Sequence, residues 1–132
     1  MIIGIGTDLV DIRRIARMLE RHGDRFLRKV FCEEEVRLAR RRHGEGVACT
    51  LARRFAAKEA AAKALGSGFR DGVGWRDICV ERDELHRPVL TLGGGAAARL
   101  ARIAPTGRRT CLHLALSDEY PYAQAMVIIE AL

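Results

Sequence analysis

Aromatic residues are scarce in this chain. Only 5% of its 132 residues are Phe, Tyr or Trp, with a single Trp and two Tyr. RNA and single-stranded DNA are commonly held by bases stacked on aromatic side chains, so a nucleic-acid-binding domain of that kind has few platforms here. The hydrophobic residues, 48% of the chain, must build a core mostly from Ala, Leu, Ile and Val. This length is typical of one domain, and we expect residues 1–132 to form it.

Paired cysteine motifs and long apolar runs are also missing. The four cysteines include no C-x-x-C pair, which argues against a zinc site. No apolar stretch approaches the ~20 residues of a membrane span. Met1 is followed by a glycine and an aspartate within eight residues, unlike a signal peptide. We therefore expect a cytoplasmic protein with free thiols and no membrane partner.

Positive charge is concentrated in one part of the chain. The 23 basic and 17 acidic side chains leave a net charge of +6, and residues 13–42 alone hold eleven Lys/Arg against five Asp/Glu. A charged helix face is often simply solvated. This concentration nevertheless favours an acidic or phosphate-rich partner. A small basic nucleic-acid-binding domain is the alternative that charge leaves open.

Hydrophobic periodicity predicts an α+β fold with a mainly antiparallel sheet packed with helices. The expected strands cover residues 2–6, 77–82, 88–92, 110–117 and 122–130. The expected helices begin near Leu9, with a break near Gly23, and continue over 32–42, 51–65 and 93–104, with a loop at 43–49. The first helix carries a stripe of arginines opposite its apolar face, namely Arg14, Arg17, Arg21 and, past the break, Arg25.

Two carboxylates lie where they need an explanation. Asp8 follows the first strand, where it either caps the next helix or acts as a metal ligand at a strand end. Glu59 lies in the middle of the helix 51–65. It either forms an exposed pair with Lys63, worth roughly 0.3–0.5 kcal/mol, or lies on a packed face where a cation must offset its desolvation.

Two further features are weaker signals. Gly66-Ser67-Gly68 allows close approach of a phosphate, but it follows the C-terminal end of a helix, which has the wrong dipole for an anion and is also where a plain helix stop is expected. His113 lies on the strand face opposite three leucines, and a lone strand histidine is more often structural than functional.

The motifs "GIGTDLVDIRRI" and, about fifty residues later, "RRFAAKEAAAKALGSG" together resemble the holo-(acyl-carrier-protein) synthase family of small 4'-phosphopantetheinyl transferases. The segments "GVGWRDICV", "RPVLTL" and "HLALSDEYPYAQAMVIIE" extend the similarity over nearly the whole chain. The resemblance implies the fold of this family and its reaction. In that reaction a serine of an apo acyl-carrier protein attacks the β-phosphate of coenzyme A, and 3',5'-ADP leaves.

The resemblance also implies roles for individual residues. Asp8 and Glu59 would be ligands of Mg²⁺, a role consistent with the oxygen ligands that this ion prefers. Lys63 would steady the transferring phosphate. The residues placed against coenzyme A would be Arg54, Gly66, Ser67, Gly68 and His113.

The same resemblance implies a role for the basic helix and an oligomeric state. Arg14, Arg21 and Arg25 match family positions that would dock an acidic carrier protein, mainly raising the association rate. The family architecture is a homotrimer with active sites between subunits. Residues 1–132 would form one 4'-phosphopantetheinyl transferase domain serving a fatty-acid carrier or a related polyketide carrier.

Two positions depart from the family pattern. Cys32 stands where relatives have Thr or Ser, so the following helix lacks a good N-cap. Asp118 stands where many relatives have a histidine. The serine proton would then pass to Asp118, Glu59 or a metal-bound water.

Overall fold

The computed structural model describes residues 1–132 and has the α+β composition that the sequence predicts. The strands are β1 (Ile2–Asp11), β2 (Ile78–Arg82), β3 (Pro88–Leu92), β4 (Thr110–Glu119) and β5 (Tyr122–Ala131). The helices are α1 (Ile12–His22), α2 (Asp24–Val30), α3 (Glu33–Arg40), α4 (Glu45–Ala64) and α5 (Gly94–Ile103), with a short 3₁₀ turn, η1 (Trp75–Asp77). No helix combines the length and the apolar character that crossing a membrane requires.

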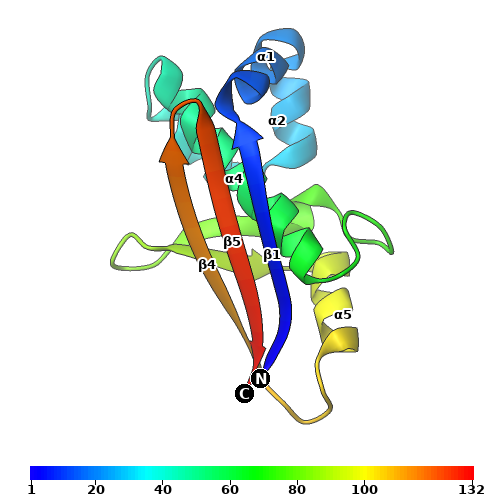
Figure 1. Ribbon diagram of the computed structural model, residues 1–132. Coiled ribbons are helices and arrows are strands. Elements are labelled where there is room, and N and C mark those ends of the chain that lie inside the picture. Colours follow the sequence, from blue (N-terminus) through cyan, green and yellow to red (C-terminus); the bar gives the residue numbers. More distant parts are fainter.

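All strand pairs are antiparallel, but the strands form two sheets rather than one. β5 lies between β1 and β4 in a three-stranded sheet, and β2 pairs with β3 in a separate hairpin. Figure 1 shows the three long strands side by side, with the two chain ends next to each other. The N-terminal amino group of Met1 donates to the carbonyl of Ala131 at 2.9 Å, which ties these ends together.

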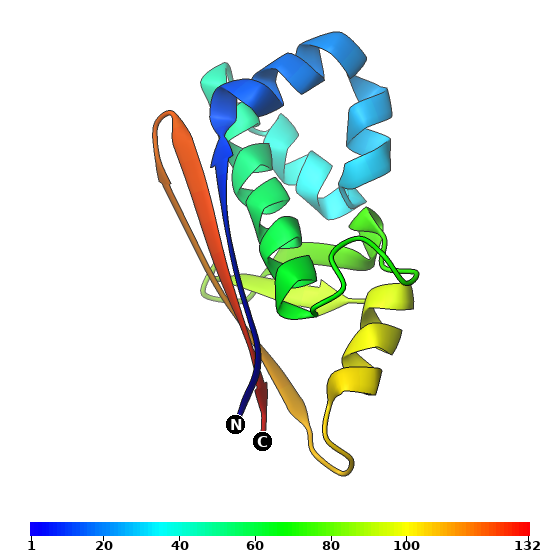
Figure 2. The same cartoon turned by 45° about the vertical axis from the view of Figure 1, so that its right-hand side comes forward.

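α4 covers one face of the three-stranded sheet, packing mainly on β1 and β5 (Figure 2). Gly4 and Gly6 of β1 make this approach close, because a Cβ added at either glycine would come within 2.2 Å of the Ala64 carbonyl oxygen or 1.9 Å of the Ala60 carbonyl oxygen. α4 is rich in alanine, and many of its alanines are fully buried. Small residues on both elements therefore bring the helix backbone onto the strand.

The boundaries of β1 and α4 differ from the sequence prediction. β1 continues through Asp11 because each of these residues pairs with β5, and this ladder outweighs the local helical pattern. Asp11, not Asp8, caps α1 by accepting from the Arg13 amide at 2.9 Å, so the helix-cap interpretation of Asp8 is wrong. Likewise, most of the predicted loop at 43–49 belongs to α4, which begins at Glu45. The predicted break at Gly23 is confirmed, with φ at +48°.

The other face of the three-stranded sheet has no helix against it (Figure 2). Its exposed side chains include large apolar ones at Ile5, Leu9, Tyr122 and Met126. Isolated surface apolar residues are ordinary, but several on one sheet face are typical of an interaction surface.

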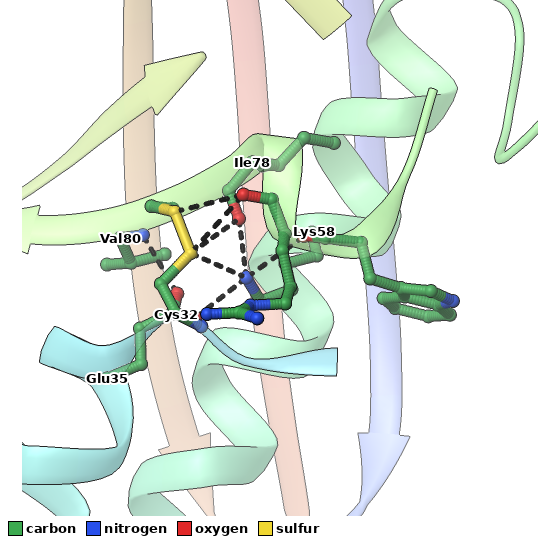
Figure 3. Close-up of a disulfide and its surroundings, with 8 residues drawn as sticks. Cys32, Glu35, Lys58, Ile78 and Val80 are labelled. Atoms are coloured by element: carbon green, nitrogen blue, oxygen red, sulfur yellow. Dashed lines mark hydrogen bonds and ion pairs between the residues drawn. A yellow bond between two sulfur atoms is a disulfide. The ribbon is translucent and has the colours of Figure 1, made fainter. Parts of the chain in front are cut away.

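The junction of α3, α4 and β2 contains a buried polar network and a disulfide (Figure 3). Lys58 and Glu35 are both fully buried and form an ion pair at 2.7 Å. Cys32 and Cys79 are bonded to each other, with their Cα atoms 6.0 Å apart. The prediction of free thiols is therefore wrong for this pair and confirmed only for Cys49 and Cys111. A search for closely spaced cysteines fails here because 47 positions separate the partners and only the fold joins them.

Candidate active site

Asp8 and Lys63 meet where α4 crosses β1. Asp8 lies on the helix-covered face of β1, on the same side as Gly6, and its side chain is 16% exposed. Lys63 donates to the Asp8 carboxylate at 3.1 Å and to the Thr7 carbonyl at 2.9 Å. The close glycine packing of β1 places this strand carboxylate within reach of the last turn of the helix.

Glu59 lies one helical turn before Lys63 and is half-buried. Burial raises the pKa of Glu59, and the neighbouring Asp8 carboxylate raises it further, while Lys63 and Arg14 act in the opposite direction. Lys63 pairs with Asp8 rather than with Glu59, so the predicted exposed Glu59–Lys63 pair is absent. Two carboxylates thus share one lysine at a partly buried position.

This donor set suits a hard divalent cation. The chain holds no group of three or more His, Cys, Asp or Glu side chains that would bind a metal by themselves. Mg²⁺ in phosphate-handling enzymes needs fewer, because one or two carboxylates suffice when substrate phosphates and waters complete the octahedron. Asp8 and Glu59, which repel each other in the absence of a cation, fit that requirement.

The glycine loop after α4 ends the helix as predicted. Gly66 and Gly68 both have positive φ, and their amides donate to the Lys63 and Ala62 carbonyls at 3.0 and 3.1 Å. The Ser67 hydroxyl donates to the Gly68 carbonyl at 2.8 Å. These bonds close the helix end and leave the loop beside Lys63.

Arg54 is a buried cation without an anionic partner. It is 3% exposed, donates one hydrogen bond to the Thr50 carbonyl at 3.2 Å, and leaves its Nε without a partner. None of the ion pairs of the chain includes it. Burial, followed by the neighbouring Arg53 cation, lowers the pKa of Arg54 to about 10. An anion bound next to this guanidinium would offset the cost of burying its charge.

Arg54 lines an open cleft of about 560 Å³, which we call the arginine cleft. Three more arginines and a histidine line it, and the full set is Glu34, Arg37, Leu38, Arg41, Arg54, Val80, Glu81, Arg82 and His86. Apart from Arg54, the sequence interpretation did not find these residues. They come from segments about forty residues apart, so the only sequence signal was the general excess of arginine.

His113 and Asp118 do not join the Asp8–Glu59 pair within one chain. His113 is on the uncovered face of the sheet, as predicted from the leucine alternation, with its Nε2 3.0 Å from Glu130. Asp118 is at the end of β4 and forms an ion pair with Arg53 at 2.7 Å. The hydrogen bond from Arg53 lowers the pKa of Asp118. This arginine partner was not anticipated from the sequence.

The three arginines expected to dock a partner are exposed on α1 and α2. Arg21 ends up in the last turn of α1, and Arg25 follows the break in α2. Arg14 lies nearest the carboxylate site, with its guanidinium 5.5 Å from the centre of the Phe55 ring and its charge acting on Glu59. The basic surface therefore begins beside the candidate active site.

The small α+β scaffold thus carries paired carboxylates with a lysine beside them, and a separate set of arginines, a combination of side chains suited to binding phosphate groups. A family model, described as the 4'-phosphopantetheinyl transferase superfamily, matches residues 4–125. The chain belongs to this superfamily and is a transferase, which confirms the resemblance seen in the sequence.

The relatives agree over the full length. The chain is 60% identical to the holo-[acyl-carrier-protein] synthase of Paramagnetospirillum magneticum, over 99% of this chain and 98% of that one. Among solved structures, the holo-[acyl-carrier-protein] synthase of Neisseria meningitidis aligns with a TM-score of 0.84 and 35% identity, covering 98% and 99% of the two chains. The Bacillus anthracis enzyme, solved in complex with coenzyme A (3',5'-ADP), aligns with a TM-score of 0.80 and 32% identity, covering 100% and 99%.

Proposed function

We propose that the protein transfers the 4'-phosphopantetheine group of coenzyme A to a serine of an apo acyl-carrier protein, giving the holo carrier and 3',5'-ADP. The observation that carries this proposal is the meeting of Asp8, Glu59 and Lys63 between β1 and α4. The similarity to holo-[acyl-carrier-protein] synthases, one of them solved with coenzyme A, supports the choice of donor and acceptor.

In this proposal Asp8 and Glu59 hold Mg²⁺. When bound, the ion supplies positive charge against the pyrophosphate of coenzyme A and orients it for attack. Lys63 donates two ammonium protons to Thr7 and Asp8 and its side chain is half-exposed, so its third proton can contact a phosphate oxygen at the same place. The loop Gly66-Ser67-Gly68 borders this position.

Arg54 supplies a second anion-binding position. Its burial without a counter-ion and the surrounding cationic side chains suit the other phosphate of coenzyme A. Arg54 and Glu59 are five residues apart on α4, so they point about 140° apart around the helix. Because the two side chains point to different sides of α4, one extended substrate would most simply contact Arg54 of one subunit and Glu59 of a neighbouring subunit.

The position of His113 also indicates an active site that is shared between subunits. It is on the uncovered sheet face, whereas Asp8 is on the face covered by α4. We propose that His113 lines the nucleotide pocket of a neighbouring subunit in a homotrimer assembled through the uncovered face. Among the side chains of this protein, Asp118 or Glu59 would accept the serine proton. The ion pair with Arg53 favours the ionised form of Asp118.

The basic surface of α1 and α2 completes the proposal. Arg14, Arg21 and Arg25 dock an acidic carrier protein so that its serine reaches the carboxylate site next to Arg14. Because coenzyme A and carrier proteins are used inside cells, we also propose a cytoplasmic location. One connected hydrophobic core supports a single domain over residues 1–132.

The deciding experiment is incubation of the protein with coenzyme A, Mg²⁺ and an apo carrier protein, followed by intact mass spectrometry. We expect the carrier to gain one phosphopantetheine, and 3',5'-ADP to form in equal amount. Chelation of the metal with EDTA should stop the gain, and added Mg²⁺ should restore it. No transfer to any of several fatty-acid and polyketide carriers would refute the proposed function.

A further inference from the structure

The arginine cleft has two walls that come from different parts of the chain. α3 and the residue that follows it provide Glu34, Arg37, Leu38 and Arg41, whereas β2 and the turn after it provide Val80, Glu81, Arg82 and His86. Arg54 of α4 also lines the cleft, and α4 packs against both α3 and β2. A ligand that contacts both walls would therefore be sensitive to how firmly α3 is held against β2.

The Cys32–Cys79 disulfide joins the segment that precedes α3 to β2, and so links the two walls covalently (Figure 3). Cys32 is the residue directly before α3, and Cys79 lies in β2 directly before the cleft residue Val80. No other covalent link connects the walls, since the remaining cysteines are free.

Noncovalent contacts hold the same junction, so the walls do not depend on the disulfide alone. The Glu35 carboxylate accepts from the amide of Cys32 at 2.7 Å and from the amide of Val80 at 2.8 Å. Lys58 pairs with Glu35 and donates to the carbonyls of Trp75 and Ile78. We therefore expect the junction to stay folded when the disulfide is reduced, but with more freedom between α3 and β2.

We propose that the Cys32–Cys79 pair is a redox-controlled clamp on the arginine cleft, and that its oxidation state regulates how tightly the cleft binds a phosphorylated ligand. A covalent link between the walls lowers the ordering cost of binding, so the oxidised form binds more tightly. This regulation rests on the proposed function only for the identity of the natural ligand, the nucleotide part of coenzyme A.

The position of the pair suits reversible exchange. Both cysteines are only half-buried, as a disulfide that exchanges with a small thiol needs to be. The Lys58 ammonium lies 3.9 Å from the Cys32 sulfur and favours the thiolate that attacks a disulfide, while the Glu35 carboxylate paired with Lys58 opposes it. Disulfides of cytosolic proteins, where they occur, are usually transient and redox-sensing rather than structural.

The chemistry is a thiol–disulfide exchange with a low-molecular-weight disulfide. The Cys32 thiolate attacks one sulfur of that disulfide and releases one thiol. The Cys79 thiolate then attacks the Cys32 sulfur of the mixed disulfide and releases the second thiol. Two protein thiols are oxidised and one external disulfide is reduced to two thiols. A dithiol reverses both steps.

The test compares ligand affinity in the two redox states of the full-length protein. We would oxidise one sample with glutathione disulfide, reduce another with dithiothreitol, and verify by intact mass that the two differ by two hydrogens. Calorimetric titration with 3',5'-ADP should show binding tighter by about threefold or more in the oxidised sample. Equal affinities in the two samples would overturn the clamp.

The variants separate the clamp from other effects of oxidation. Cys32→Ser removes the bond and places a good helix N-cap before α3, so it should fold and bind equally under both conditions. Cys79→Ser removes the bond from the other wall and should behave alike, whereas Cys111→Ser should keep the wild-type difference. A difference that persists in both Cys32→Ser and Cys79→Ser would contradict the proposal.

Arg82→Ala should weaken binding in both redox states, and unchanged binding would show that the probe occupies another site and overturn the assignment to the cleft.

Failure of this inference is distinguishable from failure of the proposed function. Transfer of phosphopantetheine to a carrier, combined with redox-independent binding of 3',5'-ADP, would remove the clamp and leave the function. Redox-dependent binding of 3',5'-ADP without transfer to any carrier would refute the proposed function and leave the clamp.

Discussion

Glu59 is the residue on which the proposed reaction most depends. It is half-buried next to Asp8, and no ion pair of the chain neutralises it. Glu59→Gln keeps the size of the side chain but removes a charged metal ligand. We expect the transfer rate to fall by about 100-fold or more, while thermal unfolding shows a folded protein. Rates are measured by intact mass of the carrier.

The matched control for Glu59 is Glu20→Gln, which removes an exposed carboxylate from α1 and should leave the rate unchanged. The metal role of Glu59 also predicts that the variant is most impaired when Mg²⁺ is limiting. Activity near the wild-type level at limiting Mg²⁺ would show that Glu59 does not hold the metal.

Asp11 gives a second prediction for a single residue, which concerns the pH dependence of stability. Arg13 hydrogen-bonds its carboxylate and lowers the pKa of Asp11 from 3.8 to about 2. Because the folded-state pKa is below the unfolded value, the stabilisation is complete above about pH 5 and is lost as the pH falls towards 2. The melting-temperature difference between wild type and Asp11→Asn should therefore shrink over this range. A difference that is constant down to pH 2 would exclude this linkage, and Asp71→Asn serves as the exposed control.

At the scale of elements, the contact of β1 with α4 determines where Asp8 and Glu59 meet. A Cβ on Gly6 would lie 1.9 Å from the Ala60 carbonyl oxygen, a backbone atom that cannot turn away. Gly6→Ala should therefore push the helix off the strand, destabilise the protein by about 1–3 kcal/mol and lower the transfer rate. Urea denaturation measures the first effect.

Gly93→Ala is the control for this substitution, because Gly93 is exposed, has negative φ and faces open space. It should change the denaturation midpoint little. If Gly6→Ala denatures at the same urea concentration as the wild type, the close packing of β1 on α4 is not required.

The basic face of α1 and α2 is tested best at Arg21, which is exposed and farther along α1 than Arg14, whose charge acts on Glu59. Arg21→Glu should raise the KM for carrier protein by about tenfold at low salt, with little change in the KM for coenzyme A. The difference from wild type should diminish as salt is added. Arg102→Glu carries the same charge change on α5, at the other end of the molecule in Figure 1, and should have no such effect. Equal changes in both KM values would exclude a docking role for Arg21.

These elements also show what the sequence reveals and what it leaves out. The alanine-rich part of α4, the start of α5 after Gly93 and the alternation in β4 follow local rules, and the structure confirms them. The length of β1 does not follow local rules, because its second half is a strand only through pairing with β5. The arginine cleft and the Cys32–Cys79 bond join segments far apart in sequence, so no local pattern predicts them. The positions of Asp8 and Glu59 already mark them as candidates in the sequence, but only the resemblance carried by two motifs assigns them, with Lys63, to one site.

At the scale of the whole molecule, the uncovered sheet face is the surface most in need of a partner. Ile5 and Leu9 are 64% and 65% exposed on the same face of β1, and Met126 of β5 is exposed next to them. His113 is on this face too, on β4. Joining copies of the chain through this face buries apolar area and brings His113 of one copy towards another, which the proposed trimer requires.

The assembly therefore predicts a specific effect of charge on this face. Ile5→Lys places an ammonium group in the proposed interface but points away from α4, so the isolated subunit should remain folded while the trimer dissociates. Sedimentation equilibrium should give a trimer for the wild type and a monomer for Ile5→Lys, and the transfer rate per subunit should fall with the loss of trimer. Leu85→Lys, which changes a 71% exposed leucine in the turn between β2 and β3, should remain trimeric and active. A wild-type monomer, or an Ile5→Lys variant that stays trimeric, would place the active site within one subunit or on another interface. His113 would then need a different role.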